Sequence, residues 1–119
     1  MQEVRETYIE RIYELKQRKG YVRAIDLASI LNVKPSTVTE MLQKLFKEGY
    51  VHYEKYRVVD LTPKGLELAQ KLEKRHQAIK KLLMYIGVSE EIADKDACII
   101  EHIISKESIE KIQDFAKKI

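Results

Sequence analysis

Residues 23–49 contain two short segments whose apolar residues recur at helical spacing, with a break of about three residues between them. The first lies in RAIDLASILNV and the second in PSTVTEMLQKLFKEG. In the second, Val38, Met41, Leu42 and Leu45 follow the i, i+3, i+4, i+7 pattern of an amphipathic helix. The break between the segments is too short for any other element, so the chain here is restricted to two helices joined by a tight turn. This pattern predicts a helix-turn-helix motif.

A stretch rich in tyrosine and valine, YVHYEKYRVVDLT (50–62), follows the second segment. Its polar centre at Glu54 and Lys55 predicts two short strands joined as a hairpin, although no Asn-Gly type of turn is present. A hairpin that follows a helix-turn-helix is a wing. Residues 1–62 are therefore predicted to form a winged helix-turn-helix domain, an architecture typical of DNA binding.

Further helical patterns flank this region. Residues 7–15 predict a helix ahead of the motif, and a long helix capped by Thr62 and starting at Pro63 extends to about Ile86. Residues 89–105 are expected to form one broken or two short helices, and residues 108–119 a final amphipathic one. The expected helix stops are Gly20, Gly49 and Gly87. We therefore predict a mainly α fold with a small β-hairpin, in which residues 63–119 form a second, helical domain.

The composition is that of a folded helical protein, with 45% hydrophobic and 34% charged residues. No apolar run approaches the ~20 residues needed to cross a bilayer. The first residues, MQEVRETYIERIYELKQ, contain no signal-peptide core, so we expect a cytoplasmic protein with no membrane partner. The net charge of +3 permits binding to nucleic acid without requiring it.

The outward face of the second helix of the motif, at residues 35–48, carries hydrogen-bonding and basic side chains suited to base edges and phosphates. In an isolated helix, such a face is more often a solvated surface. The preceding helix and the following wing favour a DNA interface instead. The candidate DNA-binding residues are Lys34, Pro35, Ser36, Thr37, Thr39, Glu40, Gln43 and Lys44, with Lys55 and Arg57 near the tip of the wing.

A second candidate site lies in DKDACIIEHIIS (94–105), which contains the only cysteine of the chain. In a helix, Cys98, Glu101 and His102 fall within about 100° of one another, whereas the isoleucines fall on a different face. A thiolate, a carboxylate and an imidazole form a donor set for a divalent transition metal, and a fourth ligand must come from elsewhere. From the spacing alone, it is equally consistent that Glu101 and His102 are solvated and that Cys98 is a small border hydrophobe.

A catalytic alternative also starts from this stretch. Cys98 and His102, one helical turn apart, could supply a thiolate and a base for nucleophilic catalysis. The sequence has no evident glycine-rich oxyanion loop and no third residue to orient the base. An enzyme is therefore disfavoured.

Almost the whole chain resembles the diphtheria-toxin-repressor family of metal-dependent transcriptional regulators, whose short members include manganese-transport regulators. The resemblance rests on blocks in the family's order: TYIERIYEL, KPSTVTEMLQKL, GYVHYEKYRVVDLTPKG, KRH and DACIIEHIIS. It implies a homodimeric repressor of metal homeostasis genes that binds double-stranded operator DNA when a metal ion ties its two lobes together. Residues 63–119 would then be its helical metal-binding and dimerisation domain. The alternative is a winged-helix regulator that needs no metal, with Cys98 as a core thiol.

The resemblance also implies a ligand set, which is Glu10, His76, Cys98, Glu101 and His102, with Thr7 where the family has methionine or aspartate. A water or a backbone carbonyl is expected to replace the ligand at position 7. Cys98 resembles iron-type members and Glu10 resembles manganese-type members, so the site is a hybrid. Because sulfur is a soft donor, Fe²⁺ is favoured, with Mn²⁺, Co²⁺ and Zn²⁺ as alternatives.

Overall fold

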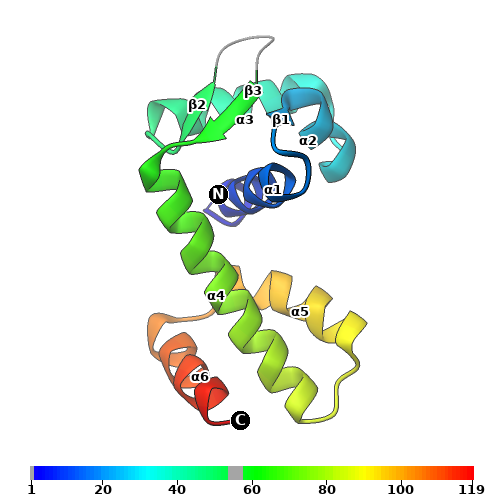
Figure 1. Ribbon diagram of the computed structural model, residues 1–119, viewed down its shortest axis with the longest axis vertical. Coiled ribbons are helices and arrows are strands. Elements are labelled where there is room, and N and C mark those ends of the chain that lie inside the picture. Colours follow the sequence, from blue (N-terminus) through cyan, green and yellow to red (C-terminus); the bar gives the residue numbers. More distant parts are fainter. Residues whose placement is uncertain (1, 54–57) are drawn as a thin grey trace. The chain divides into compact units, whose positions relative to one another are not determined.

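The computed structural model describes residues 2–53 and 58–119 (Figure 1). The chain forms two compact units, Met1–Ala69 and Gln70–Ile119, and the boundary between them falls inside helix α4 (Pro63–Tyr85). The expected boundary at residues 62 and 63 stays a prediction. Lys55 and Arg57, the two wing candidates for DNA contact, lie outside the described residues.

The first unit contains the helix-turn-helix and the two strands of the wing. Its elements in chain order, before α4, are α1 (Gln2–Lys19), β1 (Val22–Arg23), α2 (Ala24–Leu31), α3 (Pro35–Lys47), β2 (Val51–Tyr53) and β3 (Val58–Leu61). The strands form an antiparallel sheet in the order β1-β3-β2, in which Val59 of β3 pairs with Val22 on one side and Tyr53 on the other. The hairpin of β2 and β3 confirms the predicted wing, whereas β1 was not predicted.

The turn between α2 and α3 is built by Asn32, which adopts the left-handed conformation with φ 55°. The backbone N–H groups of Asn32 and Val33 donate to the carbonyls of Ser29 and Ala28, at 3.3 and 3.1 Å. Pro35 then opens α3, where its missing N–H costs no helical hydrogen bond. Val38, Leu42 and Leu45 of α3 are buried, as predicted, against the apolar side chains of α1 and α2.

The start of α4 is fixed to the end of α3 by Thr62 and Gly65. The Thr62 hydroxyl donates to the Gly49 carbonyl at 2.6 Å and accepts from the Gly65 N–H at 3.1 Å, which confirms Thr62 as the cap of α4. A Cβ atom on Gly65 would lie 2.0 Å from the Tyr50 carbonyl oxygen. Glycine is therefore the residue that permits this close approach of two backbone segments.

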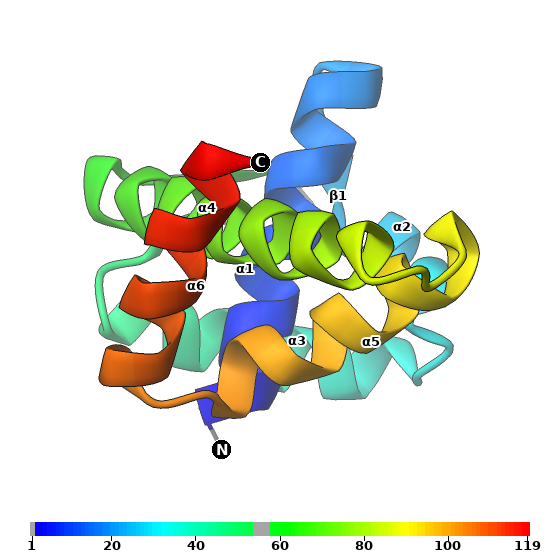
Figure 2. The same cartoon turned by 90° about the horizontal axis from the view of Figure 1, so that it is seen from below.

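The second unit consists of the remainder of α4, α5 (Glu90–Ile103) and α6 (Lys106–Lys118), with α5 and α6 packed against α4 (Figure 2). Its core contains Ile79, Ala97 and Ile109, one residue from each helix. The prediction of a broken helix or two short helices over residues 89–105 was wrong, because α5 is continuous and contains neither glycine nor proline. Among the described residues, no helix is both long and apolar enough to cross a membrane.

Candidate metal centre and nucleic-acid interface

Helices α4 and α5 bring four of the candidate metal ligands together within the second unit. Cys98, Glu101 and His102 come from one side of α5, as the helical spacing predicted, and His76 comes from α4. The Glu101 side chain has no exposed surface, and those of His102 and His76 are 7% and 12% exposed. Glu101 and His102 are therefore not solvated surface residues.

The distances between the donor atoms fit a shared metal ion. The Nδ1 atom of His76 lies 3.4 Å from Oε2 of Glu101 and 3.8 Å from Sγ of Cys98, and Nε2 of His102 lies 3.2 Å from Oε1 of Glu101. Ligand atoms bound to one ion at about 2.0–2.3 Å lie roughly 3–4 Å apart. Most protein N–H···O hydrogen bonds are shorter, near ~2.9 Å. His76 thus lies within this range of both Glu101 and Cys98, and His102 lies within it of Glu101.

The electrostatics of the cluster also favour a cation. The pKa of His76 is raised to about 9, chiefly by its interaction with the Glu101 carboxylate, while burial opposes the shift and Asp94 adds to it. In the metal-free protein this imidazole is thus protonated at neutral pH, and its charge compensates a buried carboxylate. A metal ion would replace that proton and take over the compensation.

The two remaining candidate ligands, Thr7 and Glu10, belong to α1 in the first unit. The Thr7 hydroxyl donates to the backbone carbonyl of Glu3 at 2.8 Å, so its proton is already used within the helix. Glu10 is 7% exposed, and so is no ordinary solvated helix residue. The ligand roles of Thr7 and Glu10 stay predictions.

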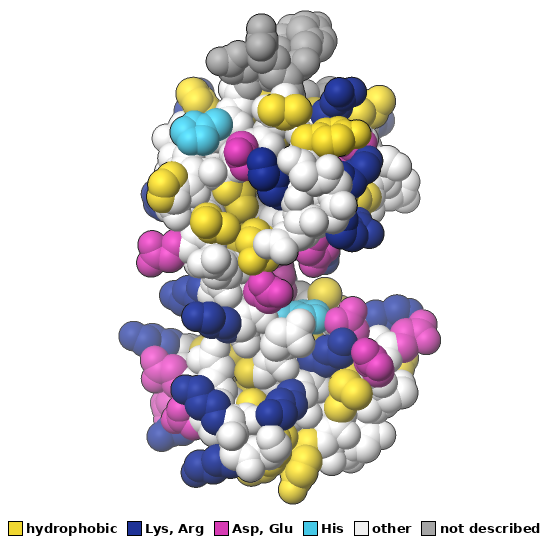
Figure 3. Space-filling view, in the orientation of Figure 1, with side chains coloured by type: hydrophobic (Ala, Val, Ile, Leu, Met, Phe, Trp, Pro, Cys, Tyr) yellow, Lys and Arg dark blue, Asp and Glu magenta, His cyan; other side chains and the backbone are white. Residues whose placement is uncertain are grey.

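One functional candidate was missed in the sequence. Asp94 lies one turn before Cys98 on α5, and its Oδ1 atom is 2.7 Å from Nε2 of His76. The sequence signal for Asp94 was its position four residues before the candidate ligand Cys98, which places both on one side of a helix. On the face drawn in Figure 3, a histidine of the second unit lies beside acidic and basic side chains.

The outer face of α3 agrees with the predicted DNA interface in its exposure. Among the candidates there, the exposed ones are Lys34, Pro35, Ser36, Thr37, Glu40, Gln43 and Lys44. Thr39 is half-buried, and its hydroxyl donates to the Pro35 carbonyl at 3.1 Å, so this group is partly satisfied within its own helix. Gln43 and Lys44 are among the exposed side chains of this helix that are long enough to reach bases and phosphates.

Comparison with known families covers nearly the whole chain. Residues 1–59 match the iron dependent repressor N-terminal DNA binding domain, and residues 62–119 match the iron dependent repressor metal binding and dimerisation domain. The chain belongs to the iron-dependent repressor family. Members of this family are metal-dependent DNA-binding transcriptional repressors. The relatives are named transcriptional regulators, which decides against the nucleophilic enzyme, and the match to a metal binding domain decides against a regulator that needs no metal.

Named relatives and solved structures agree with this assignment. The HTH-type transcriptional regulator MntR of Geobacillus kaustophilus is 48% identical over 112 residues, which is 94% of this chain and 79% of the relative. An uncharacterized HTH-type transcriptional regulator of Methanocaldococcus jannaschii is 42% identical over 115 residues, covering 95% of this chain and 92% of the relative.

Two structures of longer proteins share the fold. IdeR of T. acidophilum matches with a TM-score of 0.80 at 30% identity, covering 92% of this chain and 52% of that one. The manganese regulator SloR matches with a TM-score of 0.80 at 29% identity, covering 97% and 54%. The chain thus spans about half the length of these two structures.

Proposed function

We propose that this repressor controls genes of metal homeostasis, binding operator DNA as a homodimer when its metal site is loaded. The observation that carries the proposal is the set of three donor pairs, His76–Glu101, His76–Cys98 and His102–Glu101, whose donor atoms lie 3.2–3.8 Å apart. A set of two imidazoles and a carboxylate that are almost wholly buried, with a half-buried thiol beside them, is unusual for a structural core, because imidazoles and carboxylates are costly to bury without a partner. It is the set expected for a divalent transition metal.

The ligands of the proposed site are His76, Cys98, Glu101 and His102 from the second unit and Glu10 from α1. These residues would supply the donor atoms for the metal ion. Glu10 and Glu101 would balance its charge, and the two imidazoles and the thiolate would set its preference among transition metals. A water or a backbone carbonyl would stand at the position of Thr7, whose hydroxyl proton is bonded within α1.

Fe²⁺ is the proposed activator, because Cys98 places a soft sulfur beside the His76 imidazole. Mn²⁺ is the second candidate. It is supported by Glu10, a hard oxygen donor, and by the likeness to SloR, which is described as a manganese regulator. The family description names iron. The two metals differ in their preference for sulfur, so Cys98 is the residue on which the choice depends.

The proposed DNA contacts lie on α3 and on the wing. Ser36, Thr37 and Gln43 are suited to base edges, and Lys34 and Lys44 are suited to phosphates. The wing residues Lys55 and Arg57 would add phosphate or minor-groove contacts.

A gel-shift experiment on the DNA upstream of the protein's own gene tests the function. Under anaerobic conditions, we expect a specific complex with Fe²⁺ and its loss when a chelator is added. His76→Ala should abolish the metal response, whereas Glu91→Gln, an exposed site on α5 that faces Lys95, should retain it. Binding that is equally tight with chelator would contradict metal control and would support a metal-independent regulator.

A further inference from the structure

The two ring nitrogens of His76 have different surroundings. Nδ1 faces the donor cluster, 3.4 Å from Glu101 and 3.8 Å from Cys98. Nε2 faces away from it and lies 2.7 Å from Oδ1 of Asp94, the length of a strong hydrogen bond. The same imidazole is therefore held at one nitrogen by a carboxylate and directed by the other at the proposed site.

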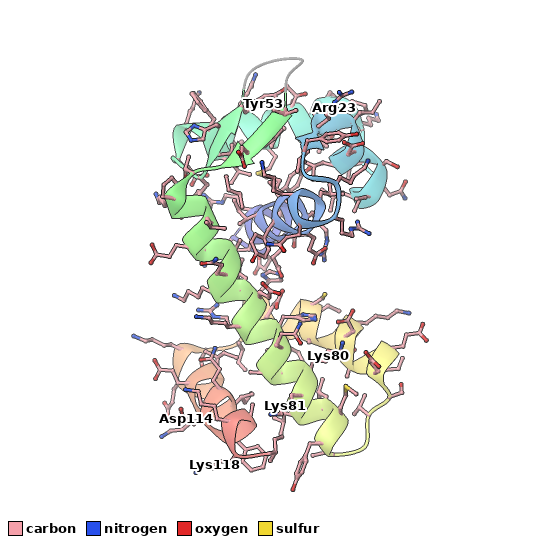
Figure 4. All side chains as sticks on the ribbon, in the orientation of Figure 1. Arg23, Tyr53, Lys80, Lys81, Asp114 and Lys118 are labelled. Atoms are coloured by element: carbon pink, nitrogen blue, oxygen red, sulfur yellow. The ribbon has the colours of Figure 1, made fainter. Side chains whose placement is uncertain are left out.

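Asp94 is itself held in place by Lys80. The Lys80 ammonium lies 3.6 Å from the Asp94 Oδ1 atom that contacts His76, and 3.4 Å from Oε1 of Glu90. Lys80 follows His76 by one turn of α4, so both side chains extend from α4 to α5. Figure 4 labels Lys80 on this side of α4, while the neighbouring Lys81 donates to the Ala116 carbonyl of α6 at 2.7 Å.

The geometry points to Asp94 as a positioning residue that holds His76 for metal binding through Nδ1, an inference that rests on the proposed function. A carboxylate that accepts the Nε2–H bond keeps the proton on that nitrogen and leaves the Nδ1 lone pair for the metal. It also fixes the rotation of the ring and raises the basicity of the ligand.

An ordinary surface ion pair is the competing explanation, because the Asp94 side chain is 52% exposed and such pairs contribute little to stability. The two explanations differ in what they predict. A surface pair would affect neither metal affinity nor the ring of His76. A positioning residue would affect both while leaving the stability of the metal-free protein nearly unchanged.

The test uses Zn²⁺ as the probe, measured by competition with a chromophoric chelator. We expect Asp94→Ala to weaken Zn²⁺ binding by about 10- to 100-fold, the usual effect of removing the carboxylate partner of a ligating histidine. Asp94→Asn keeps an oxygen that can accept the Nε2–H bond, so its loss should be smaller, below about tenfold. The matched control is Glu91→Gln, which removes the same charge from the same helix and should bind as the wild type does.

Nitrogen-15 NMR of the Zn²⁺-loaded protein gives a readout that a purely structural role would not change. In the wild type, Nδ1 of His76 should be the metal-bound nitrogen and Nε2 should carry a slowly exchanging proton. In Asp94→Ala that proton should exchange rapidly. Thermal unfolding of the metal-free variants should match the wild type, which separates positioning from loss of fold.

The outcomes also separate this inference from the proposed function. Unchanged Zn²⁺ affinity and unchanged His76 resonances in both Asp94 variants would overturn the positioning role alone, provided that His76→Ala loses affinity. A wild-type protein that does not bind Zn²⁺, or that binds it equally well after His76→Ala, would overturn the ligand assignment and the positioning role with it.

Discussion

Cys98 is the residue whose chemistry bears most directly on the choice of metal. Its sulfur lies 3.8 Å from Nδ1 of His76, within the donor cluster. A thiolate favours Fe²⁺, Co²⁺ or Zn²⁺ over Mn²⁺, which prefers oxygen donors and lies lowest in the affinity order of the divalent ions. Glu10 acts in the opposite direction if it is a ligand, because its donor atoms are oxygens.

The first prediction concerns this sulfur. The Co²⁺-loaded wild type should show an intense near-ultraviolet charge-transfer band from a Co–S bond, and Cys98→Ser should lack it. Cys98→Glu should shift the preference toward Mn²⁺ while metal-dependent DNA binding is kept, because the carboxylate preserves a ligand and changes only its softness. Absence of the band in the wild type would mean that Cys98 is not a ligand, and Fe²⁺ would lose its main support.

A second prediction at the residue scale concerns the effect of Gly65 on the stability of the fold. In Gly65→Ala, the new Cβ would lie 2.0 Å from the Tyr50 carbonyl oxygen, so α4 or the start of the wing must shift. We expect the free energy of unfolding to fall by roughly 1–3 kcal/mol, as for other overpacked sites. Glu67→Ala, at an exposed position on the same helix, is the control and should change stability by less than about 0.5 kcal/mol. Urea unfolding followed by circular dichroism measures both, and equal stability of the two variants would contradict the steric argument.

How much of the site could be predicted depended on the sequence distance between its residues. The clustering of Cys98, Glu101 and His102 follows from helix geometry, because residues three and four apart share a face. His76 lies on another helix, and its role came from a family resemblance rather than from spacing. Asp94 was missed because its contact with His76 joins positions 18 apart, and its i, i+4 spacing from Cys98 does not reveal that contact.

At the scale of elements, local signals predicted α3 and the wing, and long-range pairing accounts for what was missed. Strand β1 has only two residues, and its partner β3 lies more than thirty positions away. Such a strand forms because the sheet is already present, not because of its own propensity. The break expected in residues 89–105 is absent, because α5 contains no glycine or proline that would interrupt it.

The isoleucines of α5 also show what a local sequence pattern does not predict. They were expected to form one apolar face, yet Ile100 and Ile104 pack on the core of the second unit while Ile99 and Ile103 are 64% and 65% exposed. Helix periodicity identifies residues that share a side of a helix. It does not say which part of a wide apolar side meets its own unit and which part remains available to another chain.

The prediction at the scale of elements concerns DNA binding by helix α3. If its outer face reads DNA, Gln43→Ala should weaken binding to the operator by roughly 1–3 kcal/mol and relax its sequence preference, with metal affinity unchanged. Thr39→Ala should have a smaller effect, because the Thr39 hydroxyl already donates to the Pro35 carbonyl. Fluorescence anisotropy with operator and scrambled duplexes measures the difference.

Lys44→Ala gives the contrasting outcome. It should weaken binding to both duplexes alike and reduce the dependence of affinity on salt concentration, since a lysine that contacts a phosphate releases counterions on any sequence. Lys111→Ala, at an exposed position on α6, is the control and should change neither quantity. If Gln43→Ala alters no sequence preference, the recognition face is misassigned.

For the whole molecule, the exposed isoleucines predict the assembly state. Ile92, Ile99 and Ile103 lie on one side of α5, and each has about half or more of its surface exposed. Exposed isoleucines aligned in this way are typical of an interface, and two symmetry-related copies would also present two recognition helices to DNA. Sedimentation equilibrium should show a dimer at micromolar concentration for the wild type and a monomer for Ile103→Asp. A monomeric wild type, with or without metal, would be incompatible with this interface.

Coupling between metal and DNA is the last prediction, and it belongs to the molecule as a whole. If a metal ion raises operator affinity by some factor, operator DNA must raise metal affinity by the same factor, because both describe one thermodynamic cycle. Couplings of this kind are typically about 5- to 150-fold. Co²⁺ is a suitable probe, since its absorption reports site occupancy while anisotropy reports DNA binding, and both titrations should be run where the protein is already a dimer. If the two factors are equal, the metal-bound dimer is itself the state that binds DNA. The contrary outcome has two parts: operator DNA does not change the Co²⁺ affinity of the dimer, and Co²⁺ improves DNA binding only at low protein concentration. That outcome would mean that the metal acts by promoting dimerisation.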